Sequence, residues 1–127
     1  MKIFRFEDLL NIKKQDPLAK TYRPEVLTKE NGAMSLGGMF GLLEPNSEVP
    51  YHFHKDRESV IIIIEGEAVE IVEGEKFHLK TGDILFISAK ERHSIKNLST
   101  KTLRFIEFFT NPPLGADFFD AEEGHTK

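Results

Sequence analysis

Strand-length apolar runs separated by glycine-containing turns are the feature that most limits what this chain can fold into. The turns between them carry Gly66, Gly74 and Gly82. Short strands at near-regular spacing with such turns are typical of an all-β sandwich or barrel. With 127 residues, 39% of them hydrophobic, the chain is expected to form a single domain around one core. The expected strands are residues 60–64, 68–72, 77–79, 84–87, 93–97 and 103–109.

The composition excludes several kinds of partner and chemistry. The chain has no cysteine, which removes disulfides, thiolate metal sites and cysteine nucleophiles together. Its net charge of −4 argues against binding to a phosphate backbone. No apolar run reaches membrane-spanning length, and charges interrupt the N-terminal stretch where a signal peptide needs an apolar core. We therefore expect a cytoplasmic protein that binds neither nucleic acid nor membranes.

Three histidines and one glutamate are the residues of this chain that together predict chemistry. His52 and His54 are two apart, so both imidazoles project from the same face of an extended strand. Glu58 follows shortly after, and His93 begins a later strand. Gathered on one face of a small β fold, these four side chains would bind one divalent transition metal ion. Nitrogen and carboxylate ligands without sulfur suit iron, manganese, nickel, copper and zinc alike, so the ligands do not choose the metal.

The same residues resemble the two motifs of the cupin family, small jelly-roll barrels that hold a metal in the barrel mouth. The resemblance spans about Leu42 to Phe109 and departs from the family at Asn46, where the first motif has a glycine, and at Lys80, where the second motif has a proline. It implies a jelly-roll barrel over about residues 34–110, with an N-terminal arm at 1–33 and a C-terminal tail at 111–127. It also implies that the four candidate ligands line the mouth. The positions that carry the match are Asn46, His52, His54, Glu58 and Gly66 in the first motif, and Gly74, Gly82, His93 and Asn97 in the second.

The carboxylate ligand is less well placed than the histidines. The family's usual interval, counted back from Gly66, falls on Ser59, whereas the interval counted forward from His54 falls on Glu58. An offset of one residue turns a strand side chain to the opposite face unless a turn or bulge absorbs it. The charged segment 55–57 is able to do so, and we therefore predict Glu58 as the ligand.

Two arginines stand next to the ligand-bearing segments. Arg57 follows His54 and Arg92 precedes His93, so both are predicted on the rim of the mouth, where they would bind a small anionic ligand. The alternative is that they are ordinary solvated turn charges. Tyr51 and Glu107 are candidates for an acid or base, although Glu107 is equally compatible with an outward-facing strand position.

The run at residues 60–64 is apolar at every position, which predicts that both faces of this strand are covered. Either a loop or the N-terminal arm, or else a second copy of the chain, would provide the cover. We favour the second copy, and thus a homodimer, because the family that the chain resembles tends to dimerise.

The resemblance implies a metal-dependent enzyme, which we expect to act on a small anionic molecule. Two reaction types stay open: dioxygenation, and Lewis-acid isomerase or lyase chemistry. The competing interpretation is a non-catalytic module that binds a sugar or another effector, since function does not follow from fold. A barrel with an idle metal site is a third possibility.

Overall fold

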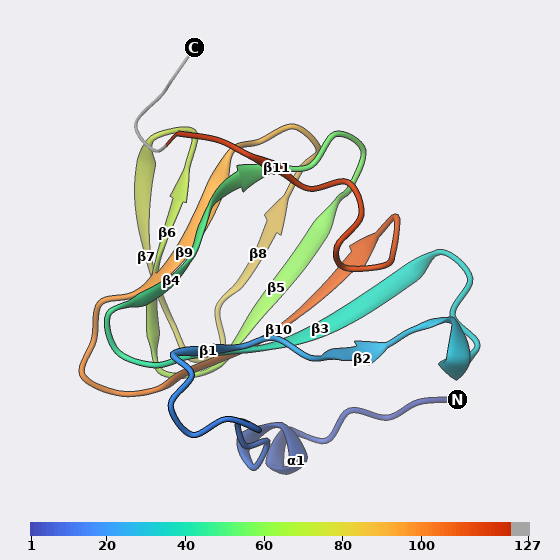
Figure 1. Cartoon of the computed structure of the whole chain (residues 1–127), viewed down its shortest axis with the longest axis horizontal. Coiled ribbons are helices and arrows are strands. Elements are labelled where there is room, and N and C mark those ends of the chain that lie inside the picture. The colour runs from blue at the N-terminus through green and yellow to red at the C-terminus, as the bar shows by residue number, and fades with distance from the viewer. Residues whose placement is uncertain (123–127) are drawn as a thin grey trace.

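Two antiparallel sheets face each other in the computed structural model, which describes residues 1–122 (Figure 1). This nearly all-β architecture confirms the predicted fold class. None of the helices among these residues is long and apolar enough to cross a membrane. The elements are α1 (Phe6–Leu10), β1 (Thr21–Tyr22), β2 (Glu25–Leu27), the 3₁₀ turn η1 (Lys29–Asn31), β3 (Leu36–Leu43), β4 (Ser47–Phe53), β5 (Ser59–Glu65), β6 (Glu67–Val72), β7 (Glu75–Lys80), β8 (Ile84–Ile87), β9 (His93–Asn97), β10 (Leu103–Thr110) and β11 (Phe119–Asp120).

From β3 onward the strands alternate between the sheets, except that the consecutive strands β6 and β7 both belong to the second sheet. The first sheet has the order β1-β3-β10-β5-β8, with β2 also paired to β3, and the second has the order β11-β4-β9-β6-β7. Residues 1–33, predicted as an arm, thus contribute two short strands to the first sheet. The last described residues return to the second sheet, where β11 pairs with β4. In Figure 1 this red segment runs across the upper end of the molecule, opposite α1.

The core lies between the sheets and is built from alternate residues of each strand. Ile61 and Ile63 of β5 and Phe105 and Phe109 of β10 contribute to it and are almost completely buried. Gly41 of β3 lies directly beneath the Phe105 ring, and a Cβ at that position would overlap the ring atoms. This close approach explains a glycine inside a buried strand.

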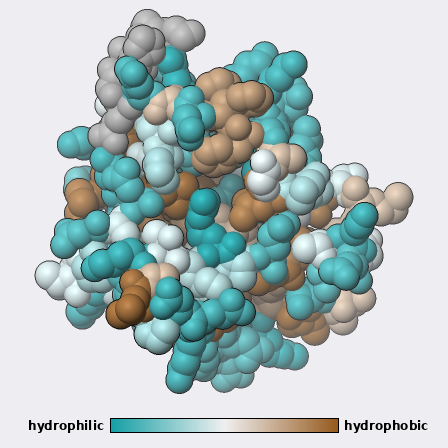
Figure 2. Space-filling model, viewed as in Figure 1, coloured by the Kyte–Doolittle hydropathy of each residue, from teal (hydrophilic) through white to brown (hydrophobic). Residues whose placement is uncertain are grey.

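The outer face of the first sheet carries a second apolar cluster, and N-terminal residues cover part of it. Ile62 and Ile64 of β5 pack there with Leu9 of α1. The alternation of β5 therefore explains most of the apolar run at 60–64, because Ile61 and Ile63 lie in the core while Ile62 and Ile64 lie in the cluster with the N-terminal segment. At the β8 end, Val60, Ile84 and Phe86 remain exposed, with 37%, 66% and 57% of their surfaces accessible. Hydrophilic residues cover most of the face seen in Figure 2, with hydrophobic residues visible in separate places between them.

Candidate metal centre

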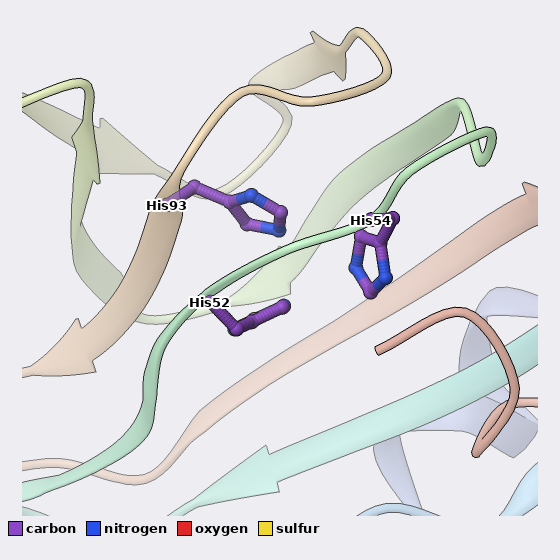
Figure 3. Close-up of side chains that lie close together, drawn as sticks. All are labelled: His52, His54 and His93. Atoms are coloured by element: carbon purple, nitrogen blue, oxygen red, sulfur yellow. The ribbon is translucent and has the colours of Figure 1, made fainter. Parts of the chain in front are cut away.

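His52, His54 and His93 come together at one end of the space between the sheets. His52 on β4 lies directly opposite His93 on β9, and His54 follows at the end of β4. The pairing of β4 with β9 shifts register between Val49 and His52, which turns the histidine-bearing end of the strand inward. All three side chains are buried, and their ligand atoms lie within 4.8 Å of one another. Figure 3 shows the three rings facing a shared space.

Each histidine is oriented by a hydrogen bond from its Nδ1 to a backbone carbonyl. The acceptors are Pro50 for His52 at 2.6 Å, Asp117 for His54 at 2.6 Å, and Glu91 for His93 at 2.9 Å. A carbonyl oxygen only accepts, so in each ring Nδ1 carries the proton. The lone pair is then on Nε2, which is the tautomer and orientation that a metal-binding histidine needs.

Burial also keeps these imidazoles neutral. It lowers the pKa of His52 to about 3, and the neighbouring His93 lowers it further in the same direction. Burial lowers the pKa of His93 to about 4, although its bond to Glu91 opposes the change. The pKa of His54 is lowered for the same first reason. Three neutral imidazoles with free Nε2 atoms are a donor set that fits a divalent transition metal ion.

Glu58 does not join the histidines in this structure. Its side chain is exposed, while the next residue, Ser59, is buried and begins β5 with its side chain on the core side. The backbone N–H of Glu58 bonds to the hydroxyl of Thr110, which sets the strand register at this point. The segment 55–57 therefore does not absorb the one-residue offset, and the predicted fourth ligand points to solvent.

The C-terminal segment supports the centre. The Asp117 carbonyl accepts from His54, and the Asp117 carboxylate accepts the backbone N–H groups of Lys55, Asp56 and Arg57 at 2.6, 2.8 and 3.1 Å. Phe118 stacks on the His52 ring with centroids 4.4 Å apart and planes 15° from parallel. Residues predicted as a tail thus fix two of the three histidines.

Arg57 holds this segment in place and is not free to bind a ligand. Its side chain is 1% exposed, and its guanidinium donates to the carbonyl oxygens of residues 110, 111, 113, 114 and 116 at 2.9 to 3.2 Å. It also lies 4.3 Å from the centroid of the Phe109 ring. The sequence predicted that Arg57 binds substrate on the rim of the mouth. It did not reveal these hydrogen bonds, because the carbonyl acceptors lie more than fifty residues away in the chain.

The other predicted residues divide between the cavity and its surroundings. Arg92 pairs with Glu73 at 3.1 Å and does not line the cavity beside the histidines. Tyr51 is buried in a separate small cluster with Val69 and Ile71, also away from that cavity. Glu107 does line it and is 8% exposed, so its side chain faces inward.

The cavity has a volume of about 440 Å³ and contains charged residues that the sequence did not single out. Arg23 enters it from the link between β1 and β2, together with Glu25 of β2, and Glu70 enters it from β6. The inward position of Glu70 could have been predicted from the sequence, because Glu70 interrupts the apolar run 68–72 and lies on the same strand face as Ala68 and Val72. Arg23 lies in a segment without clear periodicity, and nothing in its sequence context marks it.

Comparison with known proteins assigns the family. The profile of the cupin domain matches residues 39–109, more than half of the chain and the part that contains all three histidines. The chain belongs to the cupin family. An oxalate-binding protein of Thermotoga maritima is 34% identical over 64 residues, which are 50% of this chain and 53% of that protein. The chain spans about half the length of the curated relatives it matches.

Solved cupin structures agree with the fold. A double-stranded β-helix protein from Klebsiella pneumoniae superposes with a TM-score of 0.76 at 22% identity, covering 97% of this chain and 99% of that one. A predicted oxalate decarboxylase from Thermotoga maritima gives 0.66 at 27% identity, covering 72% and 81%. The family resemblance inferred from the histidine motifs is confirmed by the match to the cupin domain.

Proposed function

We propose that this cupin is a metal-dependent enzyme acting on a small anionic molecule, with one divalent transition metal ion held by His52, His54 and His93. The observation that carries the proposal is the set of three Nδ1 bonds to backbone carbonyls, which presents three free Nε2 atoms to one space. Bound there, such an ion supplies a Lewis acid for an oxygen-containing substrate. Glu58 is not part of this proposed ligand set, because its side chain is exposed.

The anionic character of the ligand rests on Arg23 and not on the arginines predicted from the sequence. Arg57 and Arg92 already donate to carbonyl oxygens and to Glu73, respectively. Arg23 lines the cavity and has Glu107 as its charged neighbour. A guanidinium offers a planar fork that matches a carboxylate or phosphate. The oxalate-binding relative is in keeping with a small carboxylate ligand.

Proton-transfer chemistry of the isomerase or lyase type is favoured over dioxygenation. Glu107 is a buried carboxyl group inside the cavity, and burial raises its pKa, while Ser59, Arg57 and Arg23 act in the opposite direction. A carboxyl group with its pKa moved toward neutrality is suited to exchange protons with a substrate. The non-catalytic alternative would use the same metal and Arg23 for binding and would not need Glu107.

Metal analysis of purified protein tests the proposal directly. Wild-type protein reconstituted with Co²⁺, and then freed of excess metal, is expected to retain one ion per chain. His52→Ala and His93→Ala are each expected to lose it. His78→Ala is the matched control, because His78 is exposed on β7. Equal cobalt in wild type and in a double variant of His52 and His93 would overturn the proposed metal centre.

Calorimetry with oxalate tests the anion-binding part separately. Arg23→Ala is expected to weaken oxalate binding to the metal-loaded protein, and Arg92→Ala is expected to leave it unchanged. Imidazole, a neutral metal ligand, should bind both variants as it binds wild type. If oxalate binds equally well to Arg23→Ala, the arginine does not recognise the ligand.

We further propose that the chain forms a homodimer through the outer face of β5 and β8. Val60, Ile84 and Phe86 lie beside one another there through the β5–β8 pairing and are exposed. A second copy would cover the part of the 60–64 strand that the N-terminal segment leaves open. Sedimentation of wild type should show a dimer that Phe86→Asp dissociates, and a monomeric wild type would refute it.

A further inference from the structure

We propose that Glu70 is a protonated carboxylic acid that donates a hydrogen bond, and then a proton, to the ligand of the cavity, with Glu107 as the opposing base. The inference rests on the proposed function in taking the substrate to bind in this cavity with its anionic group at Arg23. It adds a second acid–base residue and divides the roles between the two carboxyl groups according to their surroundings.

Glu70 is buried without any partner for its carboxyl group. It is 0% exposed on β6, between Ile95 of β9 and Phe77 of β7, and its side chain lines the cavity. Neither carboxyl oxygen has a hydrogen-bond partner among residues 1–122. An unpaired buried carboxylate costs far more free energy than a neutral carboxylic acid, so the group is protonated. A buried acid O–H that faces a cavity is a donor that lacks only its acceptor.

Glu107 faces Glu70 from the opposite sheet and has different neighbours. It lies on β10, opposite Met39 of β3 and Ile61 of β5. The Ser59 hydroxyl and the guanidinium groups of Arg57 and Arg23 act to lower its pKa against the effect of burial. For Glu70, burial and the charge of Glu107 both raise the pKa, and no cation opposes them. Surroundings that separate two carboxyl groups in this way assign the acid to Glu70 and the base to Glu107.

The remaining charged groups of the cavity do not reverse this assignment. The strands on either side of Glu70 place apolar side chains next to it, as the pairing with Phe77 and Ile95 shows. The other titratable or charged residues that line the cavity are Glu25, Arg23, Arg57, His52, His54 and His93. None of them appears among the influences on Glu70, whereas both arginines act on Glu107.

This pair fits a substrate with a carbonyl group next to a carbon that carries both a hydrogen and a hydroxyl group. Glu107 takes the proton as the C–H bond breaks, and the electron pair moves toward the carbonyl oxygen. Glu70 gives its proton to that oxygen, so an O–H bond forms and Glu70 becomes a carboxylate. In the resulting enediol, Glu107 returns its proton to the former carbonyl carbon, and the Glu70 carboxylate takes the proton of the neighbouring hydroxyl group as its oxygen becomes the new carbonyl. This completes an isomerisation with no net oxidation. The substrate class is thus a small α-hydroxy carbonyl compound whose carboxylate or phosphate binds Arg23.

Infrared difference spectroscopy on metal-free protein tests the protonation of Glu70. At neutral pH, wild type should show a carboxylic acid C=O band that is missing in Glu70→Gln. Glu67→Gln is the matched control, because Glu67 is exposed on the same strand, and its spectrum should keep the band. Absence of the band in wild type, or its persistence in Glu70→Gln, would overturn the proposal. If Glu70→Gln fails to fold, infrared spectra of wild type labelled with ¹³C in its glutamate carboxyl groups test the same point. Spectra in which every glutamate is ionised at neutral pH would exclude a protonated Glu70.

Oxalate binding to the metal-loaded protein tests the donor role. Glu70→Gln keeps an N–H donor and should bind oxalate nearly as well as wild type. Glu70→Leu removes the donor and should bind about five- to tenfold more weakly, the worth of one neutral hydrogen bond. Equal affinity for Glu70→Leu and wild type would overturn the donor role. Failure of all proteins to bind cobalt or oxalate would instead refute the proposed function, because the infrared test needs neither.

Discussion

Replacing Arg57 by methionine is the most informative single perturbation of this fold. The substitution keeps an unbranched side chain of similar length but removes the whole donor set. Five carbonyl oxygens of residues 110–116 lose their hydrogen bonds, and the contact between the guanidinium and the Phe109 ring is lost as well. The affected segment leads directly to Asp117 and Phe118, which orient His54 and His52.

The expected loss in the free energy of unfolding is about 3–5 kcal/mol. Hydrogen bonds to a charged donor contribute roughly 1.5–3 kcal/mol when they are buried. Five such bonds do not add, because they share one guanidinium and several acceptors lie in an exposed turn that water can reach. The range observed when one partner of a buried charged network is removed, about 3–5 kcal/mol, is therefore the better guide. That is a large share of the roughly 5–15 kcal/mol that stabilises a typical domain.

Urea denaturation followed by circular dichroism measures this loss, and Arg92→Met is the matched control. Arg92 forms a pair with Glu73, whose side chain is 36% exposed, so its removal should cost less than about 1 kcal/mol. Arg57→Met should also bind Co²⁺ more weakly than wild type, because the support of His54 and His52 is lost, whereas Arg92→Met should not. Equal stability of the two variants would refute the idea that Arg57 anchors the C-terminal segment.

Three further outcomes are expected. Glu58→Ala should retain Co²⁺ as wild type does, because the side chain is exposed, and a loss like that of His93→Ala would restore Glu58 as a ligand. Asp117 has a pKa below its usual value, because the hydrogen bonds from three backbone N–H groups outweigh the effect of burial. Its contribution to stability should therefore be complete above about pH 4 and should decline as the pH falls through the lower pKa of the folded state. Acid unfolding of Asp117→Asn that matches wild type would contradict this. Gly41→Ala should destabilise the fold by about 1–3 kcal/mol, measured by thermal unfolding, because the Phe105 ring beneath it is fully buried and has no room to move. An unchanged Tm would show that the core can rearrange to accept the methyl group.

The strands and the histidine cluster were predictable because they depend on local periodicity. The short apolar runs at 60–64 and 103–109 predicted strands, and the structure contains β5 and β10 there. Two histidines two residues apart share a strand face whatever the surrounding fold, and the cupin motif supplied His93 as their partner. The inward position of Glu107 also agrees with one of the two alternatives left open for it.

Only the tertiary structure determines the positions and contacts of the charged residues, because each position depends on a partner that is distant in the chain. The position at which β5 begins decides that Ser59 is buried while Glu58, one residue earlier, is exposed. The hydrogen bond from the Glu58 backbone N–H to Thr110 helps to set that register. The sequence predicts Arg57 as a cation on the rim of the mouth, whereas in the folded chain its guanidinium donates to carbonyl oxygens of the C-terminal turn. Arg23 and Glu70 enter the cavity from segments far apart in the sequence, and only the closing of one sheet over the other makes them neighbours of the same ligand.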